Sequence, residues 1–120
     1  SLKALFERFT TKEPLTYLRD FHKQLDDVDP EDLDISVLLG MTEVSFCLLL
    51  LDKDETQEEQ LFAEINKRFN ETFRLLHSAR QIRIEIAQIE FLTKHTAIIS
   101  EKKINILNKI KRVLEEKNKS

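Results

Sequence analysis

The longest uninterrupted pattern in the sequence runs from Gln57 to about Lys117, a stretch that contains no glycine and no proline. Apolar residues recur in it at intervals of three and four, which places them on one face of a helix. The stretch is preceded by Thr56-Gln57-Glu58-Glu59, which has the order of a helix capping box. We therefore predict a long helical region whose apolar face carries Leu61, Phe62, Ile65, Phe69, Phe73, Leu76, Ala79, Ile82, Ile86 and Ile89.

This helical region is interrupted by polar residues between Thr93 and Ser100. An unbroken helix of about 60 residues would be ~90 Å long, whereas a compact chain of this size has a radius of gyration of only ~14 Å. We therefore favour a break between Thr93 and Ser100, with Ser100 as the cap of a last helix. The alternative, a single long helix, would require a partner chain. The steps of three from Leu76 to Ala79 and Ile82 indicate either local overwinding or contact through a second face.

Three shorter helices are predicted before the long region. The first has an apolar stripe from Leu2 to Phe9 and ends near Thr11. The second has Thr11 as its cap and Pro14 in its first turn, where a missing N–H is harmless. The third begins at Asp29-Pro30-Glu31-Asp32, since aspartate caps helices and proline favours the first helical position. We expect the third helix to continue to Leu51.

The third helix contains the most apolar segment of the chain. From Val44 to Leu51 only Ser45 is polar, so we expect this segment to be buried on every side. Gly40 costs about 1 kcal/mol relative to alanine inside a helix, so it indicates either close packing or a break. The acidic turn at 52–55 is short and predicts an antiparallel arrangement of the flanking helices. The apolar segment should therefore face Phe62, Ile65, Phe69 and Phe73.

The composition agrees with a helical protein. One glycine and two prolines among 120 residues are too few for the many turns of a sandwich or barrel. We predict an all-α fold, an antiparallel helical bundle of four to five helices with one long central helix. Residues 1–120 are expected to form a single domain. Because the chain begins at Ser1 rather than methionine, this domain can be a fragment of a longer protein.

Charge is distributed unevenly along the chain, although the net charge is only −3. Nine acidic residues and one basic residue lie between Glu31 and Gln60, and eight basic and three acidic residues lie between Phe91 and Ser120. Such asymmetry marks an interaction surface or allows oppositely charged helices to pack beside each other. We favour packing of these helices within one bundle.

Cysteine usage and hydropathy bear on the cellular location. Cys47 is the single cysteine, so no internal disulfide can form, and its apolar neighbours indicate a core residue rather than a reactive thiol. No signal peptide is recognisable, and no apolar run approaches the ~20 residues that span a bilayer. We expect a cytoplasmic protein without a transmembrane segment.

The chemically active residue types form no catalytic or metal-binding pattern. His22, His77 and His95 are far apart, and none has Glu or His at a ligand spacing on its own helix. The segment 52–56 begins like a calcium loop but lacks the glycine and the bidentate glutamate that such a loop requires. No glycine-rich phosphate loop or nucleophile elbow is present. We therefore predict no catalytic residue, no metal ligand and no cofactor.

Histidine phosphotransfer is one alternative function. His77 lies in the middle of the predicted long helix, near Arg74 and Arg80, which could neutralise a phosphoryl group. No glycine follows it to let a partner approach, and Leu75 and Leu76 indicate ordinary packing at the edge of a core. We therefore rank phosphotransfer below the other functions.

The pattern of the chain favours a non-enzymatic helical protein–protein interaction module, such as an adaptor, chaperone or regulatory subunit. The last helix is amphipathic, with an apolar arc roughly 120° wide and a basic outer face. We predict that it binds another protein, or a second copy of this chain, through Ile106, Leu107, Ile110, Val113, Leu114, Lys111 and Arg112. The alternative is association with nucleic acid or an anionic membrane surface through the basic face. No aromatic residue is interleaved among these bases, which disfavours nucleic acid.

Overall fold

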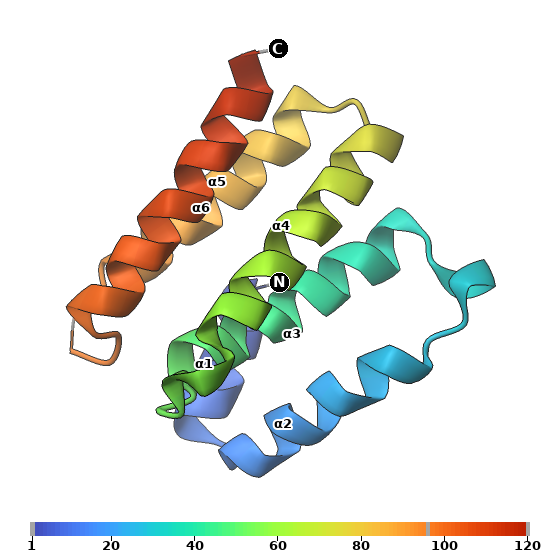
Figure 1. Ribbon diagram of the computed structural model, residues 1–120. Helices are drawn as coiled ribbons and strands as arrows, with labels where there is room; N and C mark the ends of the chain where they lie inside the picture. Colours follow the sequence, from blue (N-terminus) through green and yellow to red (C-terminus); the bar gives the residue numbers. More distant parts are fainter. Residues whose placement is uncertain (1, 96, 120) are drawn as a thin grey trace. The chain divides into compact units, whose positions relative to one another are not determined.

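The computed structural model describes residues 2–95 and 97–119, and these residues form six α-helices and no β-strand (Figure 1). The all-α prediction is confirmed, with six helices in place of four to five. Three short 3-10 helices, η1, η2 and η3, connect them. The bounds are α1 (Leu2–Thr11), α2 (Leu15–Gln24), η1 (Leu25–Asp27), η2 (Pro30–Asp32), α3 (Ile35–Leu51), η3 (Glu55–Gln57), α4 (Glu58–Leu75), α5 (Ala79–Thr93) and α6 (Glu101–Lys119).

The helices divide into two compact units, residues 1–76 and 77–120, which are described separately below. Whether they make one domain, as the sequence predicts, stays a prediction. None of the described helices combines the length and the apolar composition that crossing a bilayer requires.

The prediction of one long central helix is wrong, because the chain leaves the helical conformation twice. Leu76 is extended, and Ser78 caps α5 by accepting a hydrogen bond from the Gln81 backbone N–H at 3.1 Å. The irregular spacing around Leu76 therefore marks a helix end rather than overwinding. The predicted break between Thr93 and Ser100 is confirmed, and the Ser100 hydroxyl accepts from the Lys103 backbone N–H at 3.3 Å.

The capping box predicted at Thr56 is also wrong. Both the Thr56 N–H and its hydroxyl donate to Asp54 Oδ1, at 3.1 and 2.8 Å. This aspartate therefore begins η3, and Gln57 occupies the cap position of α4 without a side-chain hydrogen bond. A carboxylate two residues upstream binds the free backbone N–H groups more strongly than a threonine hydroxyl does.

Two further helix starts differ from the prediction. The Thr11 hydroxyl donates to the Glu7 carbonyl at 2.7 Å within α1, and Pro14, with extended ψ, takes the cap position of α2. Asp29 accepts from the Glu31 N–H at 3.0 Å, but this begins only the single turn of η2. The cap of α3 is Asp34, which accepts from the Val37 N–H at 2.9 Å.

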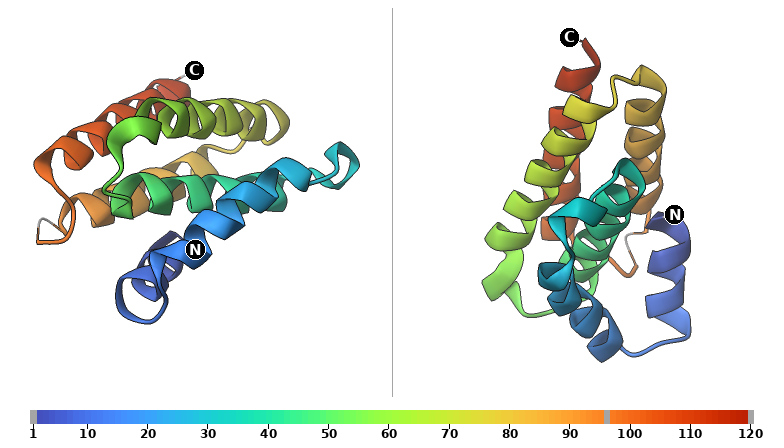
Figure 2. Two further views of the ribbon diagram at one scale, coloured as in Figure 1. Left: turned by 60° about the horizontal axis from the view of Figure 1, so that its bottom comes forward. Right: turned by 90° about the vertical axis from the view of Figure 1, so that its right-hand side faces the viewer.

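The first unit is built around α3, which contacts α1, α2 and α4 (Figures 1 and 2). Its C-terminal half is the most buried segment, as predicted, although Val44 and Leu51 are only half-buried. The predicted antiparallel pairing with α4 is confirmed, because Glu64 contacts Ser45 whereas Arg68, further along α4, contacts Met41, which is earlier in α3. The rings of Phe46 and Phe69 lie 5.8 Å apart in the same interface. Gly40 lies within the continuous helix and is exposed with no close neighbour, so the helix tolerates it without a packing role.

The flanking helices α1 and α2 bury different amounts of apolar surface. In α1, Leu2, Phe6 and Phe9 are buried, whereas Leu18 is the one buried residue among the ten of α2, all of which the structure describes. α2 is therefore a peripheral helix of the first unit.

The second unit consists of α5 and α6, an antiparallel pair joined by the loop after Thr93 (Figure 1). Its buried apolar residues recur at helical spacing on both helices, which explains why the two helices pair. They are Ile82, Ile89, Leu92, Ile99, Leu107, Ile110 and Leu114.

Candidate functional site

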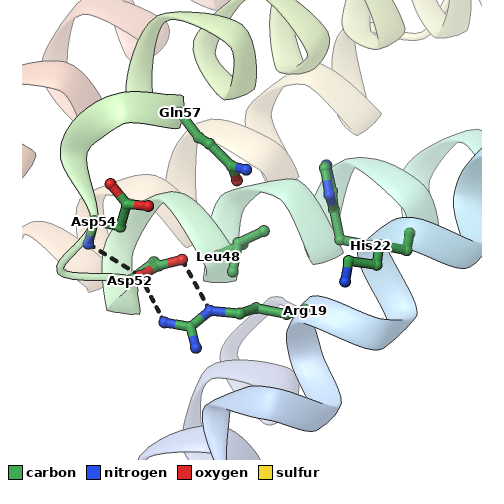
Figure 3. A pocket seen from close by; sticks show the side chains of 7 residues that line it. Arg19, His22, Leu48, Asp52, Asp54 and Gln57 are labelled. Atoms are coloured by element: carbon green, nitrogen blue, oxygen red, sulfur yellow. Dashed lines mark hydrogen bonds and ion pairs between the residues drawn. The ribbon is translucent and has the colours of Figure 1, made fainter.

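The first unit has a small pocket between α2 and the α3–α4 connection (Figure 3). Its volume is about 240 Å³, somewhat below the ~300–1,000 Å³ of typical ligand sites. The walls are mainly charged or polar, and the pocket is lined by Arg19, His22, Lys23, Leu48, Asp52, Asp54 and Gln57.

A bidentate ion pair lies at one end of this pocket. Arg19 Nη2 lies 2.9 Å from Asp52 Oδ1, and Arg19 Nε lies 3.1 Å from Asp52 Oδ2 (Figure 3). Hydrogen bonding to Asp52, together with its charge, raises the pKa of the Arg19 guanidinium. Hydrogen bonds from Thr56 lower the pKa of the neighbouring Asp54 carboxyl. Asp54 is therefore ionised at neutral pH, and the charge of Arg19 is paired with Asp52 within the protein.

A second polar cluster, centred on Glu64, links three helices of the first unit. Glu64 Oε2 lies 2.9 Å from His22 Nε2 on α2 and accepts from the Ser45 hydroxyl on α3 at 3.2 Å. Arg68, one turn along α4, donates to the Ser45 hydroxyl and, at 3.2 Å, to the Met41 carbonyl. Buried polar groups of this kind are tolerated because each has a partner.

The Glu64 cluster keeps its carboxylate charged. Burial acts to raise the pKa of Glu64, but hydrogen bonds from His22 and Gln60 and the charges of His22 and Arg68 outweigh it, so that the pKa is lowered. Burial lowers the pKa of the Arg68 guanidinium against the opposing charge of Glu64.

This arrangement differs from that of a nucleophile and its base. Ser45 and His22 both contact the same oxygen of Glu64, so the histidine does not lie between the serine and the carboxylate. Ser45 is also fully buried. The cluster can orient α2, α3 and α4 relative to one another, but its geometry does not activate the hydroxyl. Among the described residues, no three His, Cys, Asp or Glu side chains are grouped to hold a metal ion.

The predicted partner-binding residues of α6 separate into two groups. Leu107, Ile110 and Leu114 are fully buried and so cannot form part of an exposed surface.

The other predicted residues are more accessible. Ile106 and Lys111 are half-buried, and Lys111 Nζ lies 3.8 Å from Glu90 Oε1 and 3.9 Å from Glu115 Oε1. Arg112 and Val113 are exposed. That this side of α6 binds a partner stays a prediction.

His77 and Cys47 lie in different environments. His77 is exposed in the connection between α4 and α5, so its predicted position in the middle of a helix is wrong. Cys47 is fully buried, and burial, followed by the charge of Glu43, raises the pKa of its thiol to about 12. The interpretation of Cys47 as a core residue is confirmed.

An exposed aromatic pair on α2 was missed by the sequence analysis. Tyr17 is 54% exposed and Phe21 is 37% exposed, and their spacing of four places them on one side of the helix. Phe21 contacts the Phe9 ring edge-on at 6.2 Å, and the Arg8 guanidinium carbon lies 5.6 Å from the centre of the Phe21 ring. The shortness of α2, with few apolar positions to bury, was the available indication.

Comparison of the chain with models of known protein families, with curated proteins and with solved structures finds no match.

Proposed function

We propose that this chain is a non-enzymatic helical module that binds another protein. The observation that carries the proposal is the exposed aromatic pair, Tyr17 and Phe21, on the peripheral helix α2. Aromatic residues are enriched where proteins bind each other, and tyrosine is one of the residues that contribute most to binding energy.

The position of the pair is well suited to binding. Phe21 is held in place by Phe9 and Arg8, so little side-chain freedom would be lost when a partner covers it. The ion pair of Arg19 with Asp52 and the contact of His22 with Glu64 fix the opposite side of α2. The aromatic side chains are therefore presented by a helix that is already ordered.

The test is capture of partners from cell extract by the full chain, followed by measurement of affinity with the purified partner. Tyr17→Ala should weaken that affinity by about thirtyfold or more, the effect of an interface hot spot. Leu75→Ala is the matched control, because Leu75 is also exposed, at 52%, but lies at the end of α4. A partner bound equally by both variants would contradict the proposal, as would an enzymatic turnover that a single polar substitution abolishes.

A second candidate is association with nucleic acid or an anionic membrane surface, favoured by the exposure of Lys102, Lys109 and Arg112 on α6. Such binding should weaken steeply as the salt concentration rises, since phosphate contacts release counterions. Binding to anionic vesicles or oligonucleotides that is insensitive to salt, or absent at low salt, would remove this candidate.

A further inference from the structure

The chain carries an acidic surface on the first unit. Between residues 26 and 34, six of nine residues are acidic and none is basic, and all six carboxylates are exposed. We call this stretch the acidic segment; its charged residues are Asp26, Asp27, Asp29, Glu31, Asp32 and Asp34.

The acidic segment has a defined backbone. It contains most of η1 and all of η2, and Asp29 and Asp34 bind the backbone N–H groups of Glu31 and Val37 at 3.0 and 2.9 Å. It directly follows α2, which bears the aromatic pair Tyr17 and Phe21. An aromatic surface and a strongly negative one therefore lie on consecutive elements of the same unit.

The second unit carries a surface of opposite character on α6. Lys102, Lys109 and Arg112 are exposed and are separated by seven and three residues, which places them on one side of the helix. We call these three residues the basic stripe. Val113, 36% exposed, and the half-buried Ile106 flank the basic stripe. The Arg112 side chain contacts the backbone of its own helix, with Nε 3.4 Å from the Asn108 carbonyl.

We infer that the basic stripe of one copy binds the acidic segment of a second copy of this chain. The inference rests on the proposed function and names its partner. Because every copy carries both surfaces, a second copy offers a partner of matching charge for each of them. Isolated exposed ion pairs contribute little, but several charges of each sign facing each other steer association and fix its orientation.

Two other features agree with self-association. The net charge of −3 is small, so that copies repel each other only weakly. Tyr17, on the helix that precedes the acidic segment, is an exposed ring on which Arg112 of the second copy can stack. The apolar residues beside the basic stripe would be covered in the same contact.

The experiment uses two charge-reversed variants of the full chain, examined separately and mixed by analytical ultracentrifugation at low salt. The stripe variant is Lys102→Glu/Lys109→Glu/Arg112→Glu. The segment variant is Asp27→Lys/Glu31→Lys/Asp32→Lys, which leaves the two backbone-binding aspartates in place. The control matched to the stripe variant, with the same change of charge at exposed positions elsewhere, is Lys12→Glu/Lys53→Glu/Lys67→Glu.

The parent and the control should associate, each reversed variant alone should be monomeric, and the equimolar mixture of the two variants should associate again. In the mixture, the acidic stripe of one variant faces the basic segment of the other. The unchanged segment and the unchanged stripe face each other as in the parent, so that both contacts pair opposite charges. Association of the parent should also weaken as salt rises, because the Debye length falls from ~30 Å at 0.01 M to ~10 Å at 0.1 M. Circular dichroism melts of each variant establish that it is folded.

A parent chain that stays monomeric at low salt, a segment variant that associates like the parent, or a mixture that does not associate would each overturn the inference. If the parent is monomeric and the stripe binds anionic vesicles or an oligonucleotide, the stripe serves a phosphate-bearing partner and the inference also fails. The proposed function is tested separately by Tyr17→Ala, so a monomer that still captures another protein through α2 disproves this inference alone.

Discussion

α3 and α2 belong to the same unit but are held by different kinds of contact. α3 buries eight residues: Leu38, Thr42, Ser45, Phe46, Cys47, Leu48, Leu49 and Leu50. α2 buries only Leu18 among its ten residues and packs Phe21 edge-on against Phe9. Its other contacts are two charged ones, Arg19 with Asp52 and His22 with Glu64.

The difference implies an uneven distribution of stability. Burying one large apolar side chain contributes ~1.5–3 kcal/mol, whereas a typical exposed ion pair contributes ~0–1 kcal/mol. α3 therefore carries most of the stability of the unit, and α2 is free to serve as a binding surface. Partner-binding elements are commonly drawn from the less stable parts of a fold.

The largest effect should come from truncating the α3–α4 interface. Leu48 and Phe69 are each 1% exposed, so Leu48→Ala and Phe69→Ala should each lower the free energy of unfolding by about 2–5 kcal/mol. This is a large share of the ~5–15 kcal/mol expected for a whole domain. Chemical denaturation measures it. Lys109→Ala on the exposed side of α6 is the control and should change stability by less than about 0.5 kcal/mol.

The sequence predicted α3 and its burial well, because the apolar run of α3 leaves the helix without a polar side that could face solvent. It also predicted the break after Thr93, where several polar residues occur together. It missed the break at Leu76 to Ser78 because neither glycine nor proline marks it, although Ser78 with Gln81 three positions later has the order of a capping box. Helix caps failed where a nearby aspartate, such as Asp54 or Asp34, begins the turn or helix at a different position from the predicted one.

The candidate site was less predictable than the fold. Glu64 meets residues 19 and 42 positions away in the chain, Ser45 and His22, and no local pattern encodes such a meeting. It depends on how α2 and α4 lie against α3, which is a consequence of packing. The predicted α6 residues combined buried and exposed positions, because a helical wheel shows which side is apolar but not how much of it becomes covered.

The second prediction concerns the dynamics of the two helices. Hydrogen exchange of the full chain should show α2 amides opening at least about tenfold more readily than those of the C-terminal half of α3, a difference of ~1.4 kcal/mol. The reason is that α2 can separate by exposing Leu18, releasing Phe21 from Phe9 and Arg8 and breaking two charged contacts, whereas α3 would have to expose eight buried residues. Equal protection of α2 and α3, measured by mass spectrometry, would show that the two helices open as one unit.

The third prediction uses Cys47 as a reporter of the α3 core. Burial raises the pKa of its thiol to about 12 from an ordinary value of 9.0. A raised pKa in the folded state gives stability that is complete below pH 9 and is lost as the pH rises towards 12. Relative to Cys47→Ala, the parent should lose about 1.4 kcal/mol between pH 8 and pH 10. Denaturant titrations at both values measure this difference, and a parallel pH dependence of the two proteins would contradict it.

The smallest effect on stability, and the most specific to α2, should come from protonating Glu64 by lowering the pH. Its pKa is lowered in the folded protein, so its contribution to stability is present above the ordinary value of 4.5 and is lost as the pH falls through the lower folded value. Glu64→Gln should therefore show a shallower loss of stability below pH 4.5 than the parent. Glu59→Gln, an exposed change earlier on α4, should follow the parent.

Because Glu64 holds α2 through His22, hydrogen exchange in the parent at low pH should accelerate in α2 before it does so in α3. Simultaneous acceleration in both helices would mean that Glu64 supports the whole unit. α2 and α3 would then differ in how much stability their contacts provide, and not in which contacts hold them.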